Sequence, residues 1–271
     1  MPKQTRLRAT GSPRLLRAVK GNIPAVLFYA ALIVAWEIAY LAGAVRAFIL
    51  PGPSLIWQSM VDNWETLLSN GIVTAREILL GFVVGSLLGF VLALGIFYSK
   101  MLRKIIYPGA VFLQTVPKVA LAPLFIIWFG VGENAIVAIT ALICLFPVLV
   151  NTVVGFEGVD VNLLEMMHSV SANGWQKFRM IYVPASLPSI VAGLEVGMSL
   201  AVVGAIVGEF VGARAGLGYQ ILMANSRIAT DEVFAAIILI SVLGMIFYFG
   251  IRVLGRMMVG TRANNRSLRE S

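Results

Sequence analysis

The sequence has few charged residues. Only 13% of its 271 residues are Asp, Glu, Lys or Arg, whereas 59% are hydrophobic; an ordinary soluble domain has about 25% charged residues. A chain of this composition has too little polar surface to coat a soluble globule. The composition therefore excludes an ordinary soluble protein and predicts an integral membrane protein.

Cysteine and histidine are almost absent. Cys144, the single cysteine, lies in an apolar run, which excludes a disulfide framework and a cysteine-based metal site. His168, the single histidine, stands in a polar segment without a Ser/His/Asp set or an H-E-x-x-H motif. The stretch nearest to a Walker A motif, Gly255 to Thr261, lacks the lysine, so the chain cannot cradle ATP by that means. We therefore expect no catalytic residues, no metal and no bound cofactor.

Long apolar runs, by contrast, are plentiful. A helix needs about 20 apolar residues to cross a bilayer, and six segments qualify: 24–43, 72–98, 105–129, 134–153, 188–212 and 233–254. The sequence thus predicts an all-α protein with six transmembrane helices.

Lys and Arg gather in alternate segments between these runs. They are concentrated in residues 1–23, 99–104, 154–187 and 255–271. Because basic loops are retained in the cytoplasm, both termini are expected there. We predict a basic N-terminal segment (1–23), a transmembrane domain (24–254) and a basic tail (255–271). Basic residues at the ends of spans indicate topology, and no nucleic-acid partner is expected.

Residues 51–69 would then lie outside, between the first two spans. Their apolar residues recur at helical spacing. We predict an amphipathic helix at the membrane surface, with Trp57 and Trp64 as interfacial anchors.

Glycines recur at four-residue spacing in two spans. Gly81, Gly85 and Gly89 share one face of the second span, and the fifth span has a similar series that begins at Gly193 and Gly197. Such faces let another helix approach closely. We predict helix packing at these glycines, either within one subunit or between two subunits.

The third span is interrupted by prolines. Pro108, Pro117 and Pro123 each remove a backbone hydrogen bond. Gln114, Thr115 and Lys118 lie among them. A broken helix with polar residues at the break indicates a transport pathway. The alternative is a kink that serves packing only, with Lys118 reaching a head-group.

Three acidic residues fall in or near the spans: Glu37, Glu195 and Glu209. An intramembrane carboxylate is a functional candidate by default, although Glu209 could instead have a structural hydrogen-bonding role. As proton sites, the three would suit a self-sufficient secondary transporter, which is the alternative function. The inverted repeat that such transporters often show is not visible. An intramembrane enzyme is a weaker third hypothesis, because no nucleophile–base set is present.

The stretch "NLLEMMHSVSANGWQKFRMIYVPASLP", residues 162–188, is polar yet patterned. Asp160 can cap a first helix, and Asn173 can cap a second helix with Gln176 at the capping-box position. Val183-Pro184 is expected to end the second helix. A helix–turn–helix with exposed apolar residues on the cytoplasmic side predicts a docking site for another protein.

The same stretch resembles the cytoplasmic loop of binding-protein-dependent ABC transporter permeases, whose pattern is E-A-A-x3-G-x9-I-x-L-P. Glu165, Ile181 and Pro184 match it. The departures are Met166 and Met167 for the alanines, Ser171 for the glycine and Val183 for the leucine. Further segments, among them "TAREILLGFVVG", "VPKVALAPLFIIWFGVGE" and "GEFVGARAGLGY", resemble the nitrate/sulfonate/taurine branch of this family, which includes permeases for pyrimidine-type precursors.

The resemblance implies the type I ABC importer permease (MetI-like) fold in the cell (inner) membrane. It also implies a second permease copy in a homodimer, two cytoplasmic ATPases that bind ATP-Mg, and an external solute-binding protein. The solute would be small and anionic or heterocyclic: nitrate, a sulfonate, taurine, an aromatic acid or a pyrimidine-type compound. The pathway candidates are Gln114, Thr115, Lys118 and Glu209.

In the family, a short helix of the loop docks on the ATPase and couples nucleotide binding to transport. The residues that would do so here are Glu165, Met166, Met167, Ser171, Gly174, Trp175, Phe178, Ile181 and Pro184. Since Ser171 replaces the family's glycine, the turn could form at Ser171 or at Asn173-Gly174.

Overall fold

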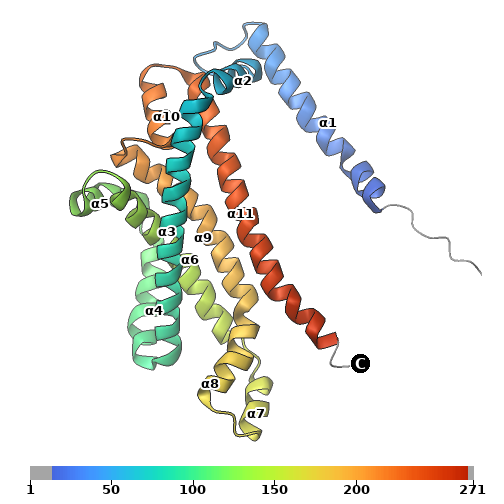
Figure 1. Cartoon of the computed structure of the whole chain (residues 1–271), viewed down its shortest axis with the longest axis vertical. Coiled ribbons are helices and arrows are strands. Elements are labelled where there is room, and N and C mark those ends of the chain that lie inside the picture. Colours follow the sequence, from blue (N-terminus) through green and yellow to red (C-terminus); the bar gives the residue numbers. More distant parts are fainter. Residues whose placement is uncertain (1–13, 268–271) are drawn as a thin grey trace, which may run out of the picture.

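The computed structural model describes residues 14–267, and it describes side chains for residues 24–258. Residues 1–13 and 268–271, at the outer ends of the predicted N-terminal segment and tail, lie outside the described residues. The described residues form α1 (Arg14–Leu41), α2 (Pro53–Asp62), α3 (Trp64–Tyr98), α4 (Lys100–Thr115), a 3-10 turn η1 (Lys118–Leu121), α5 (Ala122–Phe129), α6 (Glu133–Glu157), α7 (Val161–Ser169), α8 (Gly174–Lys177), a π turn η2 (Phe178–Tyr182), α9 (Val183–Gly212), α10 (Leu217–Ser226) and α11 (Thr230–Ser267) (Figure 1).

Within the described residues, five helical stretches are long and apolar enough to cross a membrane. They are Pro24–Leu41, Trp64–Tyr98, Glu133–Glu157, Gly174–Gly212 and Thr230–Met258. A sixth crossing is possible only if α4 and the η1–α5 segment count as one span, because the chain bends by 94° between them. The predicted third span is therefore broken. Val116 adopts an extended backbone before Pro117, as expected for a residue that precedes proline.

Helices α3, α6 and α9 form the centre of the fold, and glycines let them pack closely. Gly81 and Gly85 of α3 face Thr140 and Cys144 of α6. A Cβ atom at Gly204 of α9 would lie 3.0 Å from the Cα of Thr140. Two glycine-lined helices thus approach α6 from different sides, and most of α6 is buried.

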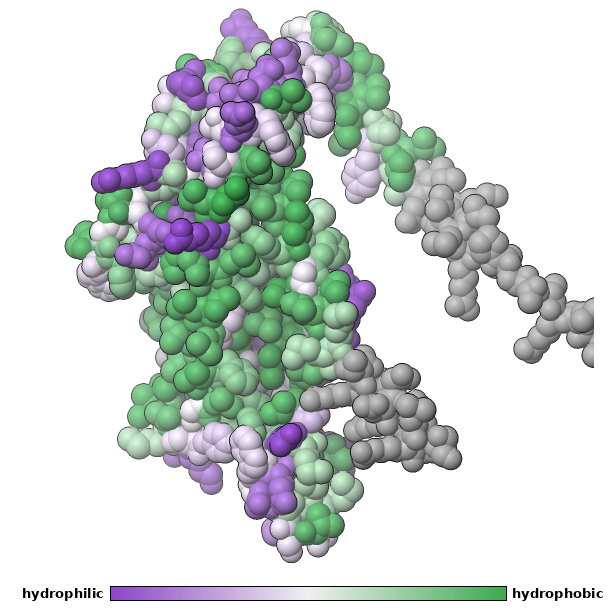
Figure 2. Space-filling view, viewed as in Figure 1, coloured by the Kyte–Doolittle hydropathy of each residue, from purple (hydrophilic) through white to green (hydrophobic). Residues whose placement is uncertain are grey.

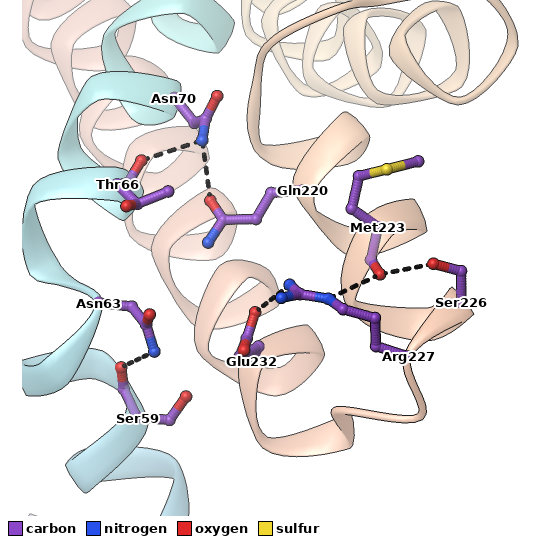
Figure 3. Close-up of polar contacts among 9 residues, drawn as sticks. All are labelled: Ser59, Asn63, Thr66, Asn70, Gln220, Met223, Ser226, Arg227 and Glu232. Atoms are coloured by element: carbon purple, nitrogen blue, oxygen red, sulfur yellow. Dashed lines mark hydrogen bonds and ion pairs between the residues drawn. The ribbon is translucent and has the colours of Figure 1, made fainter.

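The predicted surface helix over 51–69 is wrong at its C-terminal end. Asn63 ends α2 and starts α3, and its side chain donates a 3.1 Å hydrogen bond to the Ser59 carbonyl (Figure 3). Trp64 and Leu67 therefore belong to α3. Leu67 is buried with Leu217, and this burial extends the second span well beyond its predicted start at residue 72.

The outer faces of α1 and α11 are apolar and exposed. None of Pro24–Leu41 is buried, and only 11% of the apolar window in α11 is buried. Figure 1 shows α1 apart from the bundle over most of its length, with its upper end beside α2. Figure 2 shows a hydrophobic band between two more polar ends. This surface is suited to lipid, because in a bilayer only helices that satisfy their own backbone can expose apolar side chains in this way.

Two further helix boundaries differ from the prediction. The chain does not leave the helix at Val183-Pro184, because α8 continues through η2 into α9. A π turn shifts the hydrogen-bond register, which accommodates the missing N–H of Pro184. The predicted tail from residue 255 begins inside α11, whose backbone stays helical to Ser267.

Candidate functional site

The α7–α8 loop projects from one end of the bundle, at the bottom of Figure 1. Asp160 caps α7, and its Oδ1 accepts a 2.9 Å hydrogen bond from the Asn162 N–H, as predicted. The turn after α7 forms at Ser171, which has a φ of 53°. The Ser171 N–H donates to the His168 carbonyl at 2.9 Å, and the Ala172 N–H donates to the Met167 carbonyl at 3.0 Å. This pair of hydrogen bonds is a Schellman motif.

The alternative turn at Asn173-Gly174 is not used. Asn173 instead caps α8 in a capping box, as predicted: its Oδ1 accepts from the Gln176 N–H, and its own N–H donates to the Gln176 side chain, both at 2.8 Å. Gly174 lies in the first turn of α8, and nothing lies within 4 Å of the position that a Cβ atom would take. Ser171 therefore holds the left-handed position in which glycine is favoured.

The loop has a small core of its own. Met167 and Ile181 are buried with Val159. Phe178 packs against an aromatic group on the main bundle, with ring centroids 5.8 Å from Phe97 and 5.9 Å from Phe156. These contacts fix the loop to α3 and α6.

The opposite face of the loop is exposed and partly apolar. Met166 is 57% exposed and Trp175 is 65% exposed, and Glu165 lies beside Met166 on the surface. An apolar patch at the tip of a rigid projection is a suitable docking surface. The nine predicted coupling residues thus divide into buried anchors and outward-facing contacts.

The bent α4–α5 segment borders a cavity of about 500 Å³. It is lined by Gln114, Lys118, Val119, Ile143, Phe146, Pro147, Val150, Asn151, Val196, Leu200 and Val203. Thr115 is not in this lining, and its hydroxyl donates to the Phe112 carbonyl at 2.7 Å.

Lys118 is the cationic group of this cavity. Its Nζ donates a 3.2 Å hydrogen bond to the Gln114 carbonyl and lies 5.3 Å from the centre of the Phe146 ring. Among residues 24–258, no carboxylate forms an ion pair with it. The cavity therefore presents an uncompensated positive charge beside an aromatic face.

Glu209 does not join the other pathway candidates. It is 1% exposed, is not in the lining of this cavity, and lies near the C-terminal end of α9 against the first turn of α10. Its Oε1 accepts from the Thr74 hydroxyl at 2.6 Å, and its Oε2 accepts from the N–H groups of Gly218 and Tyr219. Gly216 has a φ of 111°, and a Cβ there would collide with the Glu209 carboxyl. Of the four predicted pathway residues, Gln114 and Lys118 therefore line the cavity, whereas Thr115 and Glu209 do not.

More hydrogen bonds join α3 to the turn before α10. Asn70 accepts from the Gly216 N–H at 2.8 Å and donates to Gln220 at 3.2 Å (Figure 3). The Leu217 N–H donates to the Thr74 hydroxyl at 2.8 Å. We call this polar cluster, made by α3, Glu209 and the start of α10, the α10 junction.

The sequence analysis missed Glu77, which belongs to the α10 junction. Glu77 is 3% exposed and follows Thr74, whose hydroxyl donates to the Glu209 carboxyl group, by one helical turn of α3. The available signal was an acidic residue one helical turn after Thr74 within an apolar span.

The two other intramembrane carboxylates have polar partners. Glu37 accepts from the Ser54 N–H at 3.1 Å and from its hydroxyl at 2.6 Å, which ties α1 to the first turn of α2. Glu195 accepts from the Tyr248 hydroxyl at 3.2 Å, between α9 and α11. Both therefore join neighbouring helices.

Residues 85–259 match the family described as "Binding-protein-dependent transport system inner membrane component". The chain belongs to this family. The predictions of an ABC importer permease and of an all-helical membrane fold are thereby confirmed. It is a permease subunit, and membership of the family implies an ATPase and a binding protein as partners.

Several named permeases are similar to this family member. The formylaminopyrimidine transport permease ThiX of Halalkalibacterium halodurans is 35% identical over 87% of this chain and 94% of its own length. The riboflavin permease RibX of Chloroflexus aurantiacus is 32% identical over 86% and 88%. The taurine permease TauC of Escherichia coli is 25% identical over 82% of each chain.

Solved ABC transporters share the fold. A chain of the MetNI methionine transporter superposes with a TM-score of 0.62 at 15% identity, over 72% of this chain and 97% of that one. A chain of an amino acid ABC transporter solved with histidines gives 0.60 at 20% identity, over 75% and 97%. The fold is thus that of MetI-type ABC importer permeases.

Proposed function

We propose that this permease forms, as a homodimer, the pathway of an ATP-driven importer for a small anionic or heterocyclic solute. The observation that carries this proposal is the cavity at the bent span, where Lys118 has no carboxylate partner among the described side chains and lies over the face of Phe146. A positive charge attracts an anion, and an aromatic face accepts a planar ring. Among the relatives, one is named for taurine, which carries an anionic group, and two are named for riboflavin and a formylaminopyrimidine, which contain planar rings.

The loop end of the bundle would face the cytoplasm. The basic segments of the sequence favour that orientation, and it brings the exposed face of the α7–α8 loop to the compartment that contains ATP. Two ATPase subunits would dock on this face, bind ATP-Mg and close in response. The rigid α8–η2–α9 connection would then pass their movement into the membrane.

Alternating access driven by ATP accounts for the chain better than the secondary transporter does. Glu37 and Glu195 bond to neighbouring helices and Glu209 lies in a closed cluster, so the three do not form a continuous proton path. The family itself depends on binding proteins.

Uptake by reconstituted complexes tests the proposal. The permease is co-purified with its partner ATPase and binding protein, and taurine, riboflavin and a formylaminopyrimidine are offered. We expect Lys118→Ala to slow uptake of the accepted solute at least tenfold at unchanged protein level, and Lys118→Arg to retain most of it. Lys104→Ala, which removes an exposed cation outside the cavity, is the matched control. Equal uptake by Lys118→Ala and Lys104→Ala would contradict a pathway role for Lys118.

A further inference from the structure

The α10 junction brings two acidic side chains together at a buried place. Glu77 of α3 and Glu209 of α9 are 3% and 1% exposed, and Thr74, one helical turn before Glu77, donates a 2.6 Å hydrogen bond to the Glu209 carboxyl group, which places the two acidic side chains in the same buried cluster. Two carboxylates in such a position repel each other, because burial of both side chains leaves little water to screen the repulsion. The contact becomes favourable when one of the two carries a proton and donates it to the other.

The hydrogen-bond partners decide which carboxyl carries the proton. Glu209 already accepts from the Thr74 hydroxyl, the Gly218 N–H and the Tyr219 N–H, which is the donor set that an ionised carboxylate requires. Among the described residues, Glu77 has no such set, and its Oε2 is buried without a hydrogen-bond partner there. A buried oxygen of this kind costs free energy unless it is given a partner.

We propose that Glu77 and Glu209 form a binding site for one proton, which sits on Glu77 and is donated to Glu209. The charged groups around the site favour a proton over a metal cation. Arg76 and Arg214 line a cavity of about 270 Å³ beside Glu77, and Glu133 in the same lining is paired with Arg76 at 3.0 Å. The guanidinium groups of Arg76 and Arg214 in this lining disfavour a bound metal cation, whereas a proton needs no further oxygen ligands.

The cavity gives the site access to water. Glu77 is part of its lining, so the proton can leave to a water molecule there and return. The bound proton holds α3 to α9 and to the first turn of α10, because Glu209 is the group that connects all three. Loss of the proton would place a second negative charge against Glu209 and loosen this connection.

Infrared spectroscopy of the purified permease in lipid nanodiscs tests the inference. We expect a carboxylic-acid carbonyl band at neutral pH that shifts on exchange into D₂O and is lost in Glu77→Gln. The matched control is Glu195→Gln, which changes another intramembrane glutamate with a single side-chain partner and should retain the band. Since the glutamine amide can also donate to Glu209, Glu77→Gln should unfold at the same temperature as wild type.

Three results would overturn the inference. One is a carboxylic-acid band that Glu77→Gln leaves unchanged. Another is failure of the Glu77→Gln protein to accumulate, because the glutamine amide has the same shape and should donate to Glu209 in place of the protonated carboxyl group. The third is stabilisation of the wild type by Na⁺ beyond the effect of matched K⁺, which would show a metal cation between the two carboxylates. All three measurements use the permease alone, so they are independent of the solute proposed above.

Discussion

The indole ring of Trp175 stacks on the ring of Phe178, with centroids 5.8 Å apart and planes at 28°. Trp175 is 65% exposed, whereas Phe178 packs on Phe97 and Phe156 of the bundle. The stack thus connects the exposed tip of the loop to the aromatic rings of Phe97 and Phe156. A force applied to Trp175 by a docked protein would pass directly to α3 and α6.

Trp175→Ala should weaken ATPase binding about tenfold, which corresponds to roughly 1.4 kcal/mol and is typical of an exposed aromatic anchor. Glu165→Lys, on the same face, should also weaken ATPase binding, and coupled ATP hydrolysis should fall with it. Affinity of the partner ATPase for the permease in nanodiscs is the measurement. Gly109→Ala, in α4 and outside the loop, is the control, because a Cβ there meets nothing within 4 Å among the described residues. Unchanged affinity in both Trp175→Ala and Glu165→Lys would remove this face from the mechanism.

The backbone of Ser171 gives a stability prediction. A left-handed conformation costs a non-glycine residue about 1–2 kcal/mol, so Ser171→Gly should raise the unfolding temperature of the permease. Ser171→Val should lower it, because a β-branched side chain is worse still in this region. Thermal unfolding of both variants in detergent measures the difference. The reverse order would mean that the turn lies elsewhere.

Close packing of α3 on α6 can be tested at Gly85. A Cβ at this position would collide with Cys144 and with the backbone of Ala141, and overpacking of this kind costs about 1–3 kcal/mol. We expect Gly85→Ala to lower the unfolding temperature. Gly109→Ala is the matched control, since nothing lies within 4 Å of a Cβ there and alanine favours the helix. Equal effects of the two substitutions would argue against a close α3–α6 approach at Gly85.

The proposed orientation is tested by reporter fusions. A fusion at Met60, in α2, should report the outside, and one at Val170, after α7, should report the cytoplasm. The prediction follows from the distribution of Lys and Arg. The opposite pattern would place the α7–α8 loop away from ATP and overturn its role as an ATPase contact.

Those features of the fold that depend on local sequence could be predicted. Apolar runs of sufficient length gave the spans, and Asn173 with Gln176 gave the capping box because both partners lie within one turn of helix. The choice of Ser171 for the turn could not be made from sequence, because a serine reaches a positive φ only where the surrounding structure holds it there.

Features that depend on contacts distant in sequence were missed or wrong. Glu77 and Glu209 are 132 residues apart, and no local pattern indicates that α3 and α9 bring them together. Leu67 was assigned to a surface helix because its spacing fits one, yet its burial against Leu217 makes it part of α3. The 94° bend after Thr115 was expected as a break, but its angle is set by packing of α5 on α6 and α9.

The isolation of α1 has a consequence for how sequences of this kind diverge. A helix with no buried residue in Pro24–Leu41 is constrained mainly by its length and hydrophobicity. The identity of single side chains matters where Glu37 accepts from Ser54 and where Trp36 packs on Phe234. Substitutions there should accumulate almost freely among descendants of a common ancestor, whereas α6, enclosed by protein, should change slowly.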